Sequence, residues 1–156
     1  MVPGQYSAHG SYGFSETGLR LPLQCTFSVE EFPNALTIEG QTQQGGERPV
    51  YPFRCKLERD AQSQSQAEAS VTVAGISTLS GRISLLGPTI ELLAYDLPSN
   101  TVLSTRVVPL EKPRIYELSG FLSLHGLNWF PFHFRVVPTE MEAALSNVVG
   151  ISSRRA

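Results

Sequence analysis

The chain has 156 residues, of which 41% are hydrophobic and only 17% are charged, and its formal net charge is −2. This balance gives no electrostatic reason to expect nucleic acid or an anionic membrane as a partner, and we predict neither. Thin charge combined with 13 Gly and 11 Pro is typical of an all-β chain with many turns. We expect one domain over residues 1–150 and a flexible tail at 151–156.

The first residues, MVPGQYSAHG, lack the charged and apolar regions of a secretory signal. No apolar run approaches the length of about 20 residues that a transmembrane helix needs. We therefore expect a cytoplasmic protein without a membrane span. The two cysteines, Cys25 and Cys55, cannot by themselves define a disulfide scaffold or a zinc site. Two buried free thiols are expected, with a disulfide between them as the alternative.

Alternation of apolar and polar residues is the dominant pattern along the chain, and it predicts half-buried β-strands. After a weaker segment near Tyr6 or Tyr12, residues 19–29 (LRLPLQCTFSV) place every second residue, from Leu19 to Val29, on one face. Further strands are predicted in chain order at 35–42, 50–58, 70–78, 82–96, 100–108, 115–124 and 129–137. The segment 82–96 is expected to be interrupted at Gly87 and Pro88. The total is about eight or nine strands, joined by short turns that favour antiparallel pairing.

One helix is predicted at the end of the chain, over residues 140–149. Thr139 and Glu142 have the spacing of a capping box, in which each side chain bonds to the backbone of the other residue. Met141, Leu145 and Val148 fall on one face of this helix. We expect that face to pack on the sheet or across one end of it.

Two stretches of the sequence resemble each other: YPFRCKL at 51–57 and FPFHFRV at 130–136. Each follows a strand with a glycine near its middle, Gly40 in the first case and Gly120 in the second. A glycine beside large aromatic residues suits a strongly curved sheet, because the missing side chain makes room for a neighbouring ring. The repeated pattern therefore predicts curvature and an aromatic interior.

These observations predict an antiparallel meander of about eight to nine strands that closes into a barrel, with a β-sandwich as the second choice. Closure would remove the exposed strand edges that promote aggregation. The outline is similar to that of the calycin-type barrels. Their usual glycine-x-tryptophan opening is absent here, since Trp129 is near the other end of the chain.

The candidate site is an aromatic-lined barrel interior that binds a hydrophobic or aromatic small molecule. The alternation of the strands predicts that six aromatic residues point inward: Tyr51, Phe53, Trp129, Phe130, Phe132 and Phe134. Arg54 and Arg135 are candidate polar anchors for the ligand, provided that the alternation is locally inverted. The alternative, which is the default for a barrel of this size, is an interior filled by its own side chains.

Catalytic and metal sites find little support in the sequence. His9, His125 and His133 lack metal-ligand spacing, and no cofactor motif is present. Glu91 stands in an apolar segment and would be a candidate acid or base if it were buried and paired with Arg82 or Arg106.

A barrel-type isomerase or lyase that uses Glu91 or a histidine is therefore the least favoured alternative. The stronger alternative is a structural or protein-interaction module that forms a homo- or hetero-oligomer. On the outward face, Glu39 and Glu117 are expected to face arginine, lysine or histidine side chains of the adjacent strands.

Overall fold

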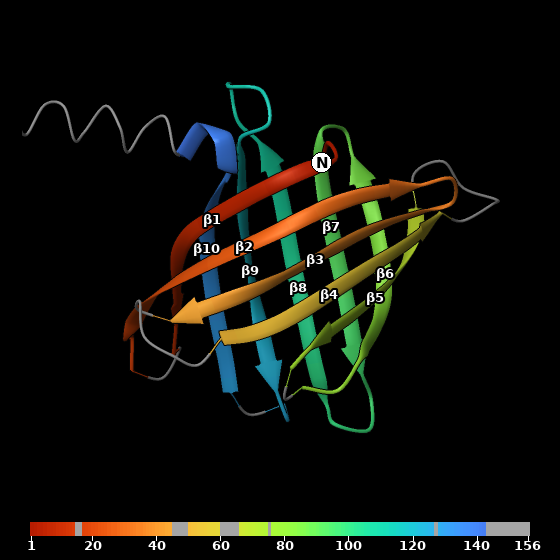
Figure 1. Ribbon diagram of the computed structural model, residues 1–156. Coiled ribbons are helices and arrows are strands. Elements are labelled where there is room, and N and C mark those ends of the chain that lie inside the picture. Colours follow the sequence, from red (N-terminus) through yellow and green to blue (C-terminus); the bar gives the residue numbers. More distant parts are fainter. Residues whose placement is uncertain (15–16, 45–49, 60–65, 75, 127, 143–156) are drawn as a thin grey trace, which may run out of the picture.

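The fold is a closed antiparallel barrel of ten strands, in which each strand pairs with its neighbours in the chain and β10 returns to pair with β1 (Figure 1). The computed structural model describes residues 1–14, 17–44, 50–59, 66–74, 76–126 and 128–142. The strands are β1 (Gly4–Gly13), β2 (Arg20–Phe32), β3 (Ala35–Gln44), β4 (Val50–Arg59), β5 (Gln66–Val73), β6 (Leu79–Leu86), β7 (Thr89–Asp96), β8 (Thr101–Pro109), β9 (Tyr116–Leu124) and β10 (Asn128–Pro138). The predicted barrel is confirmed, and the alternative sandwich is wrong.

The strand count exceeds the prediction of about eight or nine for two reasons. The weak segment near Tyr6 and Tyr12 is a full strand, β1, which closes the barrel between β2 and β10. The long segment 82–96 is divided into β6 and β7 by a turn at the expected place. Gly87 adopts a φ of 62° in that turn, a left-handed conformation that glycine tolerates better than other residues.

The prolines within the strands occupy positions where one neighbouring strand has ended. Pro52 comes immediately before Phe53, the first residue of β4 that pairs with β5. Pro131 comes immediately before Phe132, the first residue of β10 that pairs with β1. Pro22 comes immediately before Leu23, the first residue of β2 that pairs with β3. Because proline has no N–H to donate, it is tolerated where one side of the strand lacks a partner.

The two glycines that precede the aromatic strands lie where a neighbouring strand approaches closely, and at Gly120 the missing side chain makes room for a ring, as the sequence predicted. A Cβ atom on Gly40 would lie 2.5 Å from the Cβ of Phe27, and one on Gly120 would lie 2.8 Å from the ring tip of Phe132. Contacts this short do not occur in relaxed structures, so any larger residue would displace its neighbour. The ring of Phe132 therefore lies over Gly120, whereas at Gly40 the space is taken by the backbone and the Cβ atom of Phe27.

The interior contains two packed clusters. The larger one joins residues from β1, β2, β8, β9 and β10, and within it the rings of Tyr6 and Phe27 stack with their centroids 5.6 Å apart. The smaller one lies under β4 to β7. Its buried members are Cys55, Val71, Leu79 and Ala94. Burial of such apolar side chains is the main favourable contribution to folding.

The chain turns into a helix after β10. Residues 139–142 are helical, which agrees with the start predicted from Thr139, and the rest of the predicted helix lies outside the described residues. None of the helical structure in the described part of the chain is long and apolar enough to cross a membrane.

Candidate ligand-binding cavity

The barrel encloses a cavity of about 1090 Å³, and every one of the ten strands contributes to its lining. The lining is mainly aliphatic and aromatic, because the residues of one alternation face inward along each strand. Cavities that bind drug-sized ligands have volumes of roughly 300–1,000 Å³ and are mostly apolar. The interior is therefore large enough for a small organic molecule.

One end of the barrel is partly closed by the connection between β8 and β9. The Cζ atom of Arg114 lies 5.6 Å from the ring centroid of Tyr6, which places the cation over the ring. Arg114 also donates to Glu140, from Nη1 to Oε1 at 2.6 Å. The Tyr6 hydroxyl in turn donates to the carbonyl oxygen of Val2 at 2.7 Å. These contacts cover the end of the barrel above β1, β9 and β10.

The charged part of the lining lies at the same end of the barrel, on β2 and β4. Glu31 near the end of β2 and Arg59 at the end of β4 line the cavity. Arg59 Nη2 donates to Glu31 Oε1 at 3.0 Å. Gln66 at the start of β5 and Met1 also contribute to the lining. Burial lowers the pKa of the Met1 amino group, and the nearby Glu31 opposes this shift.

Both cysteines line the cavity as free thiols. Cys55 is buried, whereas Cys25 is partly exposed to the interior. Burial raises the pKa of each thiol to about 12, because the charged thiolate would lose its hydration. Neither cysteine therefore has the character of a catalytic nucleophile, which needs a lowered pKa. The prediction of two free thiols agrees with the structure.

Three of the six predicted aromatic residues line the cavity. They are Phe53 of β4 and Phe132 and Phe134 of β10. The Phe132 and Phe134 centroids lie 5.9 Å apart, and Phe134 is only 6% exposed. Phe134 belongs to the packed core, so Phe53 and Phe132 are the aromatic surfaces most open to the interior.

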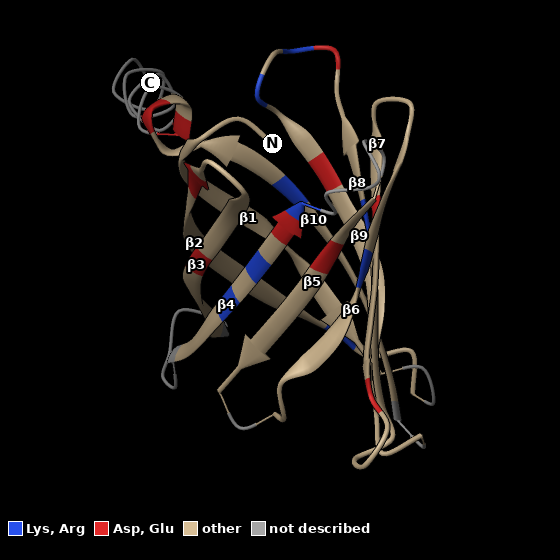
Figure 2. Ribbon diagram, turned by 90° about the vertical axis from the view of Figure 1, so that its right-hand side faces the viewer, with Lys and Arg blue, Asp and Glu red and all other residues tan. Residues whose placement is uncertain are grey.

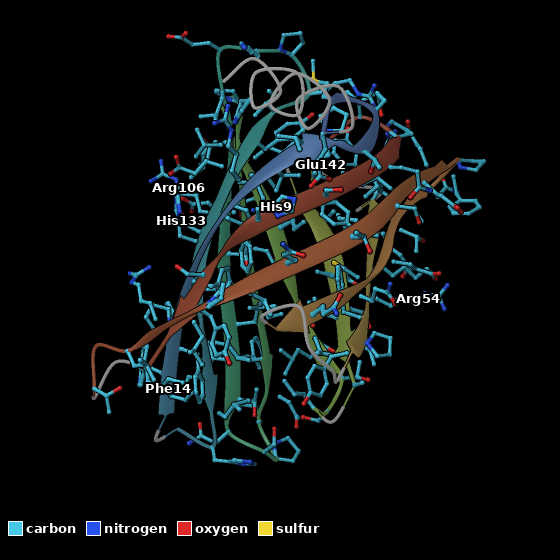
Figure 3. All side chains as sticks on the ribbon, turned by 60° about the vertical axis from the view of Figure 1, so that its left-hand side comes forward. His9, Phe14, Arg54, Arg106, His133 and Glu142 are labelled. Atoms are coloured by element: carbon cyan, nitrogen blue, oxygen red, sulfur yellow. The ribbon has the colours of Figure 1, made fainter. Side chains whose placement is uncertain are left out.

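The other three aromatic residues lie elsewhere. Phe130 packs edge-to-face against Phe14 with centroids 5.2 Å apart, near the opposite end of the barrel (Figure 3). Tyr51 is 42% exposed and does not line the cavity. Trp129 is 48% exposed and packs on Phe121 with a centroid distance of 4.5 Å. Trp129 has the opposite alternation to Phe130 and Phe132, so the inward prediction for it is wrong.

The two predicted arginine anchors point out of the barrel. Their role required an inverted alternation, and the pairing of β4 and β10 shows no such inversion. Arg54 is directed away from the barrel wall (Figure 3) and forms an ion pair with Glu39 at 2.7 Å. Arg135 is likewise exposed. Figure 2 shows basic and acidic positions following each other along the ribbon of β4.

The remaining polar candidates also lie on the outer surface. Glu91 pairs with Arg106 across β7 and β8 at 3.8 Å, and its side chain is 45% exposed. The buried acid considered for Glu91 is therefore not present in the interior. Glu117 pairs with His133 at 3.4 Å, as expected from the alternation. His125 lies in the turn after β9, where it contacts the carbonyl oxygen of Ser99 at 3.2 Å.

Metal binding gains no geometric support. In the part of the chain that the structure describes, no group of three or more His, Cys, Asp or Glu side chains could hold a metal ion. His9 contacts Glu142 at the start of the helix (Figure 3). Hydrogen bonds from Ser7 and His9 lower the pKa of Glu142.

Three polar residues of the cavity, the charged Glu31 and Arg59 and the uncharged Gln66, were not predicted from the sequence. The sequence did contain a signal for Arg59, because it continues the inward alternation of Phe53, Cys55 and Leu57. A charged residue at the end of an inward series lies at the rim of a barrel, where solvent and interior meet. Glu31 likewise continues the inward series of β2, to which Phe27 belongs.

An apolar surface covers part of the outside of the barrel. Four large side chains of β7, β9 and β10 define it, and we call it the outer apolar patch: Leu93, Tyr95, Phe121 and Trp129. Leu93 and Phe121 are both paired with Ser104 of β8, so they lie in one row across the sheet. The next row along the strands carries Glu91, Arg106 and His133, with Ser119 of β9 between Arg106 and His133. Glu91 pairs with Arg106, and Glu117, two residues before Ser119 on β9, pairs with His133.

Together, the fold and the cavity define the chain as a hollow antiparallel β-barrel with an apolar interior. No protein-family model matches the sequence, and no curated protein matches it. Among solved structures, the chain is similar to the S-type phycobiliprotein lyase CPES from Guillardia theta. The TM-score is 0.69, the alignment covers 87% of each chain, and the sequence identity is 7%. At this identity the similarity establishes the fold alone.

Proposed function

We propose that the protein is a noncatalytic barrel that binds a hydrophobic or aromatic small molecule in its interior. The observation that carries this proposal is the cavity of about 1090 Å³, which is too large to be a packing defect. The rings of Phe53 and Phe132 offer flat apolar surfaces for an aromatic ligand. The hydroxyl groups of Thr42 and Thr105, which also line the cavity, offer hydrogen bonds that orient a ligand.

The similar solved barrel is named a lyase, so catalysis is the natural alternative for this fold. Among the described residues that line the cavity, Glu31 is the only carboxylate and there is no histidine. Glu31 lies at the exposed rim in a contact with Arg59, rather than in the desolvated setting that makes a carboxyl group an effective acid. These features favour binding without chemistry.

The proposal is tested by titrating the protein with N-phenylnaphthylamine, an uncharged aromatic probe whose fluorescence rises in apolar surroundings. The probe should bind the natural chain with a defined stoichiometry. Thr105→Phe places a ring inside the cavity and should weaken binding about tenfold or more, which corresponds to about 1.4 kcal/mol. Binding should weaken because the new ring fills part of the cavity, not because the ligand loses a contact.

The matched control is Thr72→Phe. Thr72 is an exposed residue of β5, so the same change of residue type places the ring outside the barrel. This variant should bind the probe like the natural chain. The proposal fails if the natural chain does not bind the probe, or if both variants bind it equally well.

A second candidate function is a self-associating module, and the outer apolar patch favours it. Leu93 is 53% exposed, and Tyr95 and Trp129 are each 48% exposed, which is unusual for neighbouring large side chains on a monomer. Beside the patch lie the ion pairs of Glu91 with Arg106 and of Glu117 with His133, so this surface carries positive and negative side chains. Two copies related by a two-fold axis can exchange such ion-pair partners, because the same surface meets itself.

Light scattering over a range of protein concentrations tests this second candidate. A dimer that dissociates in the Leu93→Gln and Trp129→Gln double variant would support it. The control is Leu110→Gln, because Leu110 is 38% exposed in the connection between β8 and β9 and does not belong to the patch. A natural chain that stays monomeric at all concentrations contradicts the candidate.

A further inference from the structure

The cavity opens to solvent at a charged mouth formed by described residues of β2, β4, β5 and β6. Four of its lining residues are also exposed, namely Glu31, Arg59, Gln66 and Leu85. Glu31 is near the end of β2, Arg59 at the end of β4, Gln66 at the start of β5 and Leu85 near the end of β6. In an antiparallel meander these positions all lie at the same end of the barrel. They define what we call the mouth.

The lining changes character with distance from the mouth. Toward the opposite end of the strands, the described lining residues include Leu23, Val73, Leu103 and Phe132, and none of these can carry a charge. The site is therefore polarised, with charge at the entrance and apolar surface at depth. A ligand that matches it is amphipathic, because its apolar part gains from burial while its polar end stays hydrated.

The charge at the mouth favours an anion. Arg59 is the only lysine or arginine side chain among the described lining residues. Its guanidinium group has five N–H donors, and the contact with Glu31 runs through a single pair of atoms, Nη2 and Oε1. The two side chains are 70% and 50% exposed, and an ion pair this exposed is weak. Arg59 can therefore exchange Glu31 for a ligand.

We propose that the ligand is an organic anion with an apolar body, and that Arg59 holds its carboxylate or sulfonate-type group at the mouth. The planar guanidinium group binds such oxyanions through two parallel hydrogen bonds. Gln66 contributes an amide N–H on the adjacent strand, and Glu31 disfavours the anion by repulsion. This inference rests on the proposed binding function, and it adds the chemical class of the ligand.

The experiment compares two probes that share the same aromatic rings. Anilinonaphthalene sulfonate carries a negative charge, whereas N-phenylnaphthylamine is uncharged. Arg59→Met should weaken binding of the anionic probe about fivefold or more, while the affinity for the neutral probe changes less than about twofold. Glu31→Gln should strengthen binding of the anionic probe, and both effects should shrink at high salt.

The matched control is Arg54→Met. Arg54 lies on the same strand, β4, and pairs with Glu39 on the outer surface, so its loss should leave the affinity for both probes unchanged. The outer apolar patch can also bind the anionic dye. Binding in the cavity is therefore taken as the part of the signal that is lost in the Thr105→Phe variant. Thermal unfolding of each variant shows that the comparison is made between folded proteins.

The outcomes separate the two proposals. If neither probe binds the natural chain, the proposed binding function itself fails. If the neutral probe binds in the cavity but Arg59→Met and Glu31→Gln leave the anionic probe's affinity unchanged, the cavity stands and the anion inference is overturned. The inference is also overturned if Arg54→Met weakens the anionic probe as much as Arg59→Met does.

Discussion

Gly120 of β9 lies directly opposite Phe132 of β10, and a Cβ atom on Gly120 would lie 2.8 Å from the tip of the Phe132 ring. The same Cβ would lie 2.0 Å from the backbone oxygen of Ser104. Ring and backbone therefore occupy the space that a side chain at position 120 would need. The Phe132 ring can therefore lie against the cavity wall only because residue 120 has no side chain.

Gly120→Ala should consequently destabilise the fold by about 1–3 kcal/mol, the usual cost of overpacking. It should also alter the affinity for N-phenylnaphthylamine, because Phe132 lines the cavity. Denaturant unfolding measures the first effect and probe titration the second. The control is Gly13→Ala, whose new Cβ would have its nearest neighbour at 3.1 Å and should cost less than about 1 kcal/mol. Equal costs at both positions would contradict the explanation.

The proline positions lead to a second prediction. Pro131 stands where β10 has not yet begun to pair with β1, so Pro131→Ala should change the free energy of unfolding by less than about 1 kcal/mol. Ser119 of β9 pairs on both sides, with Arg106 and His133. Ser119→Pro should cost about 1–3 kcal/mol or more, or prevent folding, because it removes a ladder hydrogen bond and leaves a strand carbonyl without its donor.

Urea unfolding of the two proline-position variants distinguishes these cases. A large loss of stability in Pro131→Ala would show that the proline has a role beyond tolerance of an unpaired edge. A Ser119→Pro variant as stable as the natural chain would contradict the register of β9.

The buried thiols make stability depend on alkaline pH. The folded chain retains the protons of Cys25 and Cys55 up to a pKa of about 12, whereas the unfolded chain releases them near the ordinary value of 9.0. Above pH 9 the unfolded state therefore binds fewer protons than the folded state, and stability falls as pH rises. Each thiol should lower the stability by about 1 kcal/mol between pH 9 and pH 10, and the slope approaches about 1.4 kcal/mol per pH unit at higher pH.

The slope is obtained from urea unfolding between about pH 9 and pH 10, a window suited to thiol titration. The Cys25→Ala and Cys55→Ala double variant should show a flatter dependence, even though the loss of buried atoms lowers its stability at every pH. An unchanged slope in the double variant would mean that other groups cause the alkaline loss.

Alkylation of the same thiols locates a bound ligand. Cys25 and Cys55 face the cavity, so saturation with N-phenylnaphthylamine should slow their reaction with a small maleimide. Rates are measured separately on Cys25→Ala and Cys55→Ala, each of which retains one thiol. The control is the Thr105→Phe form, in which the probe should give little protection. Protection that persists in this form would place the bound probe outside the cavity.

The barrel could be predicted because apolar and polar residues alternate within each strand, and this pattern can be recognised in each short segment by itself. The inward positions of Phe53, Cys55 and Leu57 follow from it directly. The first strand was predicted weakly, since its glycine, serine and alanine residues carry little apolar signal. Its place became clear only from pairing on both sides, with Tyr6 opposite Phe27 of β2 and Pro138 of β10.

The site was predicted less well than the fold. Trp129 was predicted to point inward with Phe130 and Phe132, although it has the opposite alternation, that of His133 and Arg135. The alternation of β10, applied residue by residue, places Trp129 on the outer surface, where it is found. Whether the interior is hollow depends on the summed side-chain volume of ten strands relative to the barrel radius, which no single segment encodes. Residues of modest size, such as Thr105 and Ala67, leave that space open.

The central claim is that the apolar interior of this barrel holds a small molecule. Its most direct measurement is the anomalous diffraction of a crystal of the protein grown with a brominated naphthylamine. The account predicts a bromine peak inside the barrel, between the side chains of Phe53 and Phe132. A bromine peak found only on the outer surface, beside Phe121 and Trp129, would contradict it.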